Sequence, residues 1–177
     1  MINKKLRDKI LKMAKIDQDL RHRAIKDSQN KELIKKLYTT DSKNLEEAKK
    51  IIKKYGFPSF DLVGKRGSRA FWILVQHADR DLKFQKECLS LMMKLKNKNQ
   101  VYLRDIAYLT DRVRTADGKK QKFGIQYLIE NGKLILKPVL NKKKLEKWRK
   151  EYELNTIAQQ TKRNYKEYAP LLKAMKK

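Results

Sequence analysis

Cysteine, histidine, proline and glycine are all scarce in this sequence, which has one Cys, two His, three Pro and six Gly among 177 residues. The single cysteine, Cys88, excludes an internal disulfide and any zinc cluster built on several thiolates. It lies at an apolar position of FQKECLSLMM, which is typical of a buried and inert thiol. With two histidines, a metal site would consist mostly of carboxylates, and we predict neither a metal site nor a cofactor.

Long apolar runs are also missing. No stretch approaches the ~20 apolar residues of a membrane-spanning helix, and the first residues, MINKKLRDKILKMAK, lack the apolar centre of a signal peptide. We therefore expect a cytoplasmic protein without membrane contact. The sequence contains no GxxxxGK[ST], GxGxxG, HExxH, GxSxG or CxxC pattern, which argues against the common nucleotide-binding, zinc-protease, hydrolase and thioredoxin-like classes.

Acidic residues are outnumbered by basic ones: 20 Asp and Glu face 46 Lys and Arg, for a formal net charge of +26. A field of this sign attracts nucleic acid and acidic partners. However, 35 of the basic residues are lysines spread over almost every segment, whereas specific recognition of phosphates and bases relies more on arginine. A nucleic-acid-associated protein and a generic basic surface both stay open as interpretations. The oligomeric state is unknown from the sequence.

Apolar residues recur every three or four positions along the first half of the chain, which predicts amphipathic helices. One helix is expected from residue 2 to about 26. The residues Thr40–Ser42 offer N-caps for a further helix that ends at Gly56. The stretch GFPSFDLVGKRGS then indicates a loop, and Ser68 a cap for the apolar helix RAFWILVQHA.

The pattern changes after two more predicted helices, one capped by Asp79 or Asp81 and one over VYLRDIAYLTDRVR. The segment QKFGIQYLIENGKLILKPV has alternating or β-branched runs on both sides of Asn131-Gly132, a strong hairpin signal. We therefore predict a mainly α fold, a compact domain of about five to seven helices with one β-hairpin, at about 120–138, packed on it. We expect a single domain, 1–177, with a helical segment at 1–40, a core with the hairpin at 44–140 and a basic helical tail at 141–177.

His77 is the first candidate for a chemical role. It follows the apolar run FWILV in the last turn of its predicted helix, where the negative end of the helix dipole favours an imidazolium. This position suits proton transfer or the binding of an anion; the alternative is a histidine that packs the helix end and bonds to a backbone carbonyl. Asp17 and Arg21, four positions apart on the first predicted helix, lie on one face and can pair.

A second group of candidates lies closer to the hairpin. Arg112 suits bidentate binding of a carboxylate or phosphate, or alternatively a structural salt bridge to an acid such as Asp17. Gln121 and Gln126 lie on either side of Gly124 in the predicted first strand. A glycine there indicates close approach by a ligand or another backbone, or a bulge whose two amides face solvent.

The order of these segments resembles a bacterial family known as domain-of-unknown-function family 6624, whose pattern reads GWP…LVG…AAWLIVQHA-x-x-D…FQ…AYL-x-DR…G-x-x-Q-x-YGTQ. The resemblance extends from about Ile16 to Pro138 and rests on the ordered set of motifs. Phe57 stands where the family has Trp, and Phe123 and Ile125 stand where it has Tyr and Thr, so two hydroxyl groups are missing. The resemblance implies a map of site residues and no reaction. The matching positions are Asp17, Gln18, Arg21, Gly56, Pro58, Trp72, Gln76, His77, Asp81, Gln85, Tyr108, Asp111, Arg112, Gln121, Gly124 and Gln126.

From these residues we hypothesise one polar pocket between two core helices and the hairpin. Its expected catalytic residues are His77, Asp111 and Arg112, and its expected ligand-binding residues are Gln76, Tyr108, Gln121, Gln126, Asp17, Arg21 and Trp72. Three functions are compatible with it: a small hydrolase or transferase acting on a polar or anionic ligand, a non-catalytic ligand-binding or protein-interaction module, and a nucleic-acid-associated protein that uses its lysine-rich surface. Whether the protein is an enzyme is left open.

Overall fold

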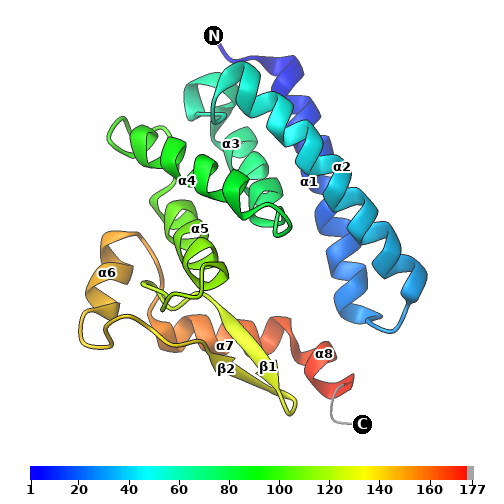
Figure 1. Ribbon diagram of the computed structural model, residues 1–177, viewed down its shortest axis with the longest axis vertical. Helices are drawn as coiled ribbons and strands as arrows, with labels where there is room; N and C mark the ends of the chain where they lie inside the picture. Colours follow the sequence, from blue (N-terminus) through cyan, green and yellow to red (C-terminus); the bar gives the residue numbers. More distant parts are fainter. Residues whose placement is uncertain (175–177) are drawn as a thin grey trace. The chain divides into compact units, whose positions relative to one another are not determined.

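The structure is a computed structural model that describes residues 1–174, in which eight helices and one two-stranded antiparallel sheet are present (Figure 1). This confirms the predicted mainly α-helical fold with one hairpin in the C-terminal half. The elements are α1 (Lys4–Lys26), α2 (Lys31–Tyr55), α3 (Phe60–Gln76), α4 (Leu82–Lys96), α5 (Leu103–Ala116), β1 (Tyr127–Glu130), β2 (Lys133–Leu136), α6 (Leu145–Glu151), α7 (Ile157–Glu167) and α8 (Ala169–Ala174).

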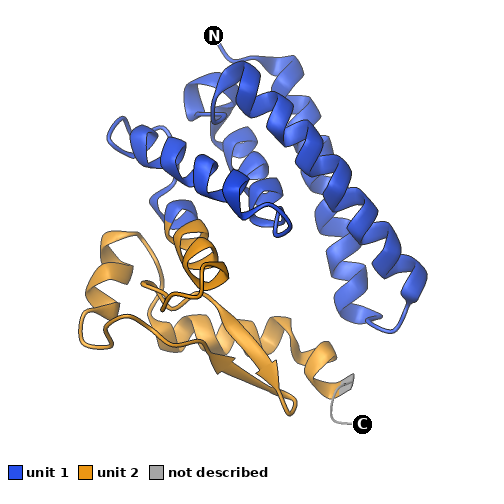
Figure 2. Ribbon diagram, in the orientation of Figure 1, with its two compact units in different colours: residues 1–106 blue, residues 107–177 orange. Residues whose placement is uncertain are grey.

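The chain folds into two compact units, and the division between them falls inside α5, between Ile106 and Ala107 (Figure 2). The first unit contains α1 to α4 with the first residues of α5; the second contains the hairpin and the last three helices. The predicted single domain with segments 1–40, 44–140 and 141–177 stays a prediction. Over the described residues, no helix is both long and apolar enough to cross a membrane.

Helix α2 begins where an asparagine caps it and then continues without a break. Asn30 Oδ1 accepts a hydrogen bond of 3.0 Å from the Leu33 N–H. The predicted helix start at Thr40–Ser42 is therefore wrong. The Ser42 hydroxyl donates to the Tyr38 carbonyl four residues back, at 3.0 Å, and so stays within the helix instead of capping a new one. Gly56 ends α2 as predicted, with φ of 69°.

Helix α3 begins earlier than its sequence suggested. Ser59 caps it by accepting a hydrogen bond from the Leu62 N–H at 3.3 Å, so the predicted cap, Ser68, lies buried inside the helix. Gly64 kinks the helix with φ of 73°, a backbone conformation that other residues rarely adopt. The residues between Ser59 and the apolar run, predicted as a loop, are thus a kinked first part of α3.

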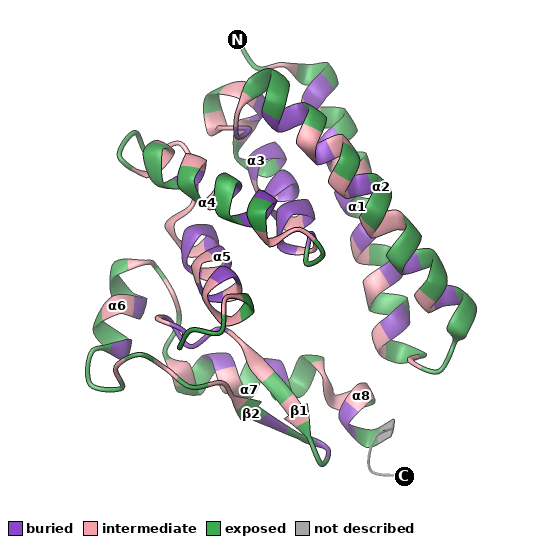
Figure 3. Cartoon of the chain, viewed as in Figure 1, coloured by how far each residue is buried: buried purple, intermediate pink, exposed green. Residues whose placement is uncertain are grey.

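Three helices form the core of the first unit: α1 contacts both α2 and α3, and α2 contacts α3. Figure 3 shows that α3 is buried along most of its length, and its side chains Phe71 and Val75 have no exposed surface. One cluster of apolar side chains joins the last turns of α1 to the beginning of α2, and consists of Leu20, Ala24, Leu33 and Leu37. The contact between α1 and α3 brings the middle of α1 to the C-terminal end of α3, where His77 is the C-cap.

The hairpin of the second unit turns at the predicted Asn131-Gly132, which have φ of 49° and 67°. The strands pair from Tyr127 with Leu136 to Glu130 with Lys133. Gln121 and Gln126 were predicted in the first strand, and this is wrong: both precede it. The segment between them has to turn back on itself, and Gly124, with φ of 69°, provides the turn.

Candidate functional site

Asp17 and His77 form the centre of the polar cluster in the first unit. His77 Nδ1 lies 2.8 Å from Asp17 Oδ2, and the Asp17 side chain has no exposed surface. Asp17 comes from the buried face of α1 and His77 from the end of α3, so the packing of these two helices creates the contact. A buried carboxylate at a histidine Nδ1 is the arrangement that orients an imidazole for proton transfer.

Arg21 extends this cluster to α2. Its Nη2 donates to Asp41 Oδ1 at 2.7 Å, and its Nε lies 3.4 Å from Asp17 Oδ1. The predicted pairing of Asp17 and Arg21 is therefore present. Asp41 had been predicted as a helix cap; instead it lies inside α2 with its carboxylate turned to the guanidinium.

The Nδ1 atom of His77 lies next to one hydrogen-bond donor and one hydrogen-bond acceptor. Arg21 Nε, a donor, lies 2.8 Å away, as does the acceptor Asp17 Oδ2. Nδ1 therefore donates to Asp17 when it carries the proton and accepts from Arg21 when it does not. Among the described residues no hydrogen bond engages the other ring nitrogen, Nε2.

The two carboxyl groups around Arg21 are shifted in opposite directions. Burial would raise the pKa of Asp17, but hydrogen bonds and charge from His77, with Gln18 and Arg21, outweigh it and hold that pKa below its usual value. Burial raises the pKa of Asp41, aided by the negative charge of Asp17, and the attraction of Arg21 does not cancel this. Asp17 is thus held as a carboxylate anion beside Nδ1 of His77.

His77 lines a pocket of about 210 Å³ in the first unit. Its side chain is 18% exposed, against 0% for Asp17. The wall combines charges of both signs with an apolar part; it includes Arg21, Tyr38, Asp41, Ala78, Asp79 and Arg80. His77 lines this pocket and Asp17 does not, so a molecule bound there can contact the imidazole but not the Asp17 carboxylate.

Asp111 belongs to the second unit, and its carboxylate accepts hydrogen bonds from the chain that precedes the hairpin. Oδ1 accepts from the Lys122 and Phe123 N–H groups at 2.6 and 3.0 Å, and Oδ2 from those of Phe123 and Ile125 at 2.9 and 3.1 Å. Burial raises the pKa of Asp111, and these hydrogen bonds oppose the rise. The Asp111 side chain has no exposed surface, and its hydrogen bonds to the backbone hold the turn around Gly124 in place.

Gln121 supports the same turn from inside. Its Oε1 accepts from the Gln126 N–H at 2.8 Å, and its Nε2 donates to the Gln126 and Lys137 carbonyls at 3.0 and 2.7 Å. Its amide therefore substitutes for a strand partner where the ladder has not yet begun. Gln126 takes part through its backbone.

The remaining predicted site residues divide between the units. Trp72 and Gln76 are buried in α3, where the Trp72 indole donates to the Asp105 carbonyl at 2.8 Å. Tyr108 and Arg112 lie on the part of α5 that belongs to the second unit, where the Tyr108 hydroxyl donates to Gln160 Oε1 at 3.1 Å. The structure thus brings together Asp17, Arg21 and His77. A common pocket with Asp111, Arg112, Gln121 and Gln126 stays a prediction.

Most residues that line the His77 pocket were not among the predicted site residues, and the most important of these are Tyr38, Asp41 and Arg80. Arg80 had a local signal, since it follows His77 within the segment QHADRD. Tyr38 and Asp41 had none, because only the continuity of α2 through 40–42 turns them toward the end of α3. In the described part of the chain, no group of three or more His, Cys, Asp or Glu is placed to hold a metal ion.

The structure therefore defines a mainly helical protein in which a histidine at the wall of a small pocket is paired with a buried aspartate. The chain belongs to the family of unknown function DUF6624, whose profile matches residues 4–172. The family resemblance inferred from the motifs is thus confirmed and covers nearly the whole chain. No curated protein and no solved structure shows a significant match.

Proposed function

We propose that the protein is a small cytoplasmic hydrolase or transferase that uses His77 as its general acid–base on a polar or anionic ligand. The observation that supports this most is the contact of His77 Nδ1 with the buried carboxylate of Asp17 at 2.8 Å, on a side chain that lines a pocket. An imidazole fixed through one nitrogen leaves the other to take a proton from a hydroxyl or a water and to return it.

The roles of the neighbouring residues follow from their contacts. Asp17 orients His77 and stabilises the imidazolium formed when Nε2 accepts a proton. Arg21 contacts both Asp41 and Asp17, and its positive charge offsets the repulsion between the two carboxylates. Asp41 lines the same pocket and burial raises its pKa, which supports a role as a second proton carrier.

The chain offers a matched control for the test, since its two histidines are His77 and the exposed His22 on α1. Purified wild type, His77→Gln and His22→Gln are assayed on a panel of activated carboxylic and phosphoric esters and of phosphate-bearing metabolites. We expect turnover that His22→Gln keeps and that His77→Gln lowers by about 100-fold or more, the usual contribution of a general acid–base.

The second candidate is a non-catalytic ligand-binding module in which the same residues form a structural network. The complete burial of Asp17 favours this structural role, because a buried carboxylate that loses its partner His77 destabilises the fold. It predicts that His77→Gln lowers the free energy of unfolding and that neither histidine variant differs from wild type in any assay of turnover. That result would exclude the enzyme.

A further inference from the structure

A second and larger pocket in the first unit adjoins that of His77. It has a volume of about 550 Å³, within the range of small-molecule sites, and shares Tyr38, Ser42 and Arg80 with the His77 pocket. We call these two pockets together the α2 groove. A molecule bound along the groove therefore has one end beside His77.

The charge of the larger pocket is of one sign. Among the described residues that line it are Lys31, Lys35 and Arg80, and none of these described residues carries a carboxylate. In the His77 pocket, by contrast, Asp41 and Asp79 balance Arg21 and Arg80. The larger pocket therefore has an excess of positive charge that extends to Arg80, where it adjoins the His77 pocket, and this charge selects a ligand with negative charge.

Arg80 is the cation best placed to bind an anion. Among the described residues it forms neither an ion pair nor a hydrogen bond, and its guanidinium lies 5.1 Å from the centre of the Tyr38 ring. Stacking on the ring holds the guanidinium without using its N–H donors. Arg21, the other guanidinium of the His77 pocket, is already engaged by Asp17 and Asp41.

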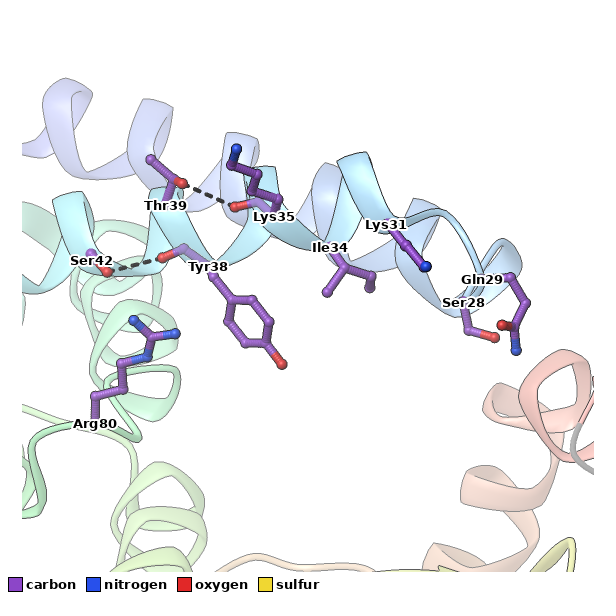
Figure 4. A pocket seen from close by; sticks show the side chains of 9 residues that line it. All are labelled: Ser28, Gln29, Lys31, Ile34, Lys35, Tyr38, Thr39, Ser42 and Arg80. Carbon is purple, nitrogen blue, oxygen red and sulfur yellow. Dashed lines mark hydrogen bonds between the residues drawn. The ribbon is translucent and has the colours of Figure 1, made fainter.

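The floor between the cations is apolar. Figure 4 shows Ile34 and Tyr38 projecting from α2 on one side, with Lys31 at one end and Arg80 at the other. Tyr38 is 52% exposed, which is a large open surface for an aromatic side chain. A planar ring of a ligand can lie against these two side chains.

The hydroxyl groups of the groove restrict the anion further. Thr39 and Ser42 donate their protons to the Lys35 and Tyr38 carbonyls, both within α2, at 3.0 Å each. Their oxygens can still accept but have no proton left to donate. The neutral donors left in the lining are those of Ser28, Gln29 and Tyr38, and its positive charge comes from Arg80, Lys31 and Lys35. These cations suit a phosphate more than a neutral polar group.

We propose that the α2 groove binds a phosphate-bearing molecule with a planar ring, of nucleotide size, whose phosphate lies on Arg80 beside His77 and whose ring lies on Tyr38 and Ile34. This rests on the proposed function, because it names the substrate class that His77 would act on. It goes beyond that function by assigning recognition to Arg80 and Tyr38, which sequence reasoning did not select.

The test measures binding by calorimetry with three probes: a nucleoside 5′-monophosphate, the same nucleoside without phosphate, and inorganic phosphate. We expect the nucleotide to bind wild type at least about 10-fold more tightly than either part alone, because only the nucleotide makes both the charge-assisted contact with Arg80 and the ring contact with Tyr38. Arg80→Gln and Tyr38→Leu should each lower the affinity for the nucleotide by about 10-fold.

Arg66→Gln is the matched control. Arg66 is exposed on α3 and lines neither pocket of the groove, so this variant loses the same charge without touching the site. Equal losses for Arg66→Gln and Arg80→Gln would overturn the proposal, as would a nucleotide that binds no better than the nucleoside. Binding only to long oligonucleotides, equally weakened by both arginine variants and by salt, would assign the interaction to the overall charge and also overturn it.

His77→Gln separates this proposal from the proposed function. We expect it to lose turnover by about 100-fold or more and to weaken nucleotide binding by less than Arg80→Gln or Tyr38→Leu does, because Arg80 and Tyr38 hold the ligand. If the nucleotide binds as expected but no turnover depends on His77, the proposed binding site in the α2 groove is supported and the proposed enzymatic function is excluded. If turnover depends on His77 but is unchanged in Arg80→Gln and Tyr38→Leu, the proposed enzymatic function is supported and the proposed binding site in the α2 groove is excluded.

Discussion

His77 Nδ1 lies 2.8 Å from Asp17 Oδ2, between residues that are 60 positions apart in the sequence. The same nitrogen lies 2.8 Å from Arg21 Nε, so its protonation decides which neighbour it bonds. The lowered pKa of Asp17 keeps the carboxylate charged, so Nδ1 lies between an anion and the Arg21 guanidinium. The tautomer of His77 is therefore the most direct experimental readout of the site.

Asp17→Asn should change that tautomer. In wild type we expect neutral His77 to carry its proton on Nδ1; in the variant, loss of the charge lets Nδ1 accept from Arg21 and moves the proton to Nε2. Nitrogen chemical shifts of the imidazoles measure this, and His22 on the surface of α1 is an internal reference. An unchanged His77 spectrum in Asp17→Asn would contradict the orienting role of the carboxylate.

Asp105 should make stability depend on pH in an unusual direction. Burial raises its pKa to about 6, against the attraction of Arg69 and Arg104. The folded state thus holds this proton more tightly than the unfolded state does, and the contribution of Asp105 to stability falls as pH rises from about 4 to 6.

Asp105→Asn has no such titration. From pH 4 to pH 7 we expect its free energy of unfolding, relative to wild type, to rise by about 3 kcal/mol, the equivalent of about two pH units. Urea unfolding at several pH values measures the difference between the two proteins. A difference that stays constant with pH would show that Asp105 has an ordinary pKa.

Asp111→Asn should lower stability, because the carboxylate accepts from three backbone N–H groups with no exposed surface. We expect a loss of about 2–4 kcal/mol in the free energy of unfolding. Glu151→Gln, an exposed acid on α6, removes the same charge and should leave stability nearly unchanged. Loss of turnover without loss of stability would instead support the catalytic role predicted for Asp111 from the sequence.

Gly124→Ala should destabilise the second unit for two separable reasons. Gly124 has φ of 69°, and a Cβ there would lie 2.8 Å from Ile157 Cδ1. Gly118, with φ of 72° and open space around it, isolates the backbone effect. We expect the free energy of unfolding, measured by thermal unfolding, to fall by about 1 kcal/mol in Gly118→Ala and by about 2–3 kcal/mol in Gly124→Ala. Equal losses would mean that Ile157 moves aside freely.

Cys88 should be unreactive while the first unit is folded. Its thiol has no exposed surface, and burial raises its pKa, so little thiolate forms. Labelling by a thiol reagent in increasing urea should follow the loss of helical circular dichroism. Rapid labelling without denaturant would contradict the packing of Cys88 on the inner face of α4.

The local features of the fold were determined by the sequence itself. Apolar spacing predicted α1, α4 and α5, and Asp81 and Gly56 marked helix ends because their side chain or backbone acts on immediate neighbours. Asn131-Gly132 located the hairpin for the same reason. The pairing of Asp17 with Arg21 was also local, since one helical turn separates them.

What only the tertiary structure decided depends on contacts between distant segments. Thr40–Ser42 resembles a cap, but the packing of α2 against α1 and α3 keeps it helical, and this directs Asp41 and Tyr38 to His77. A glutamine pattern could not show that Gln121 substitutes for a strand partner. Side-chain chemistry alone marked Asp111 and His77 as similar candidates. Burial separated them: one carboxylate is enclosed by backbone donors, and one imidazole lies at a pocket wall.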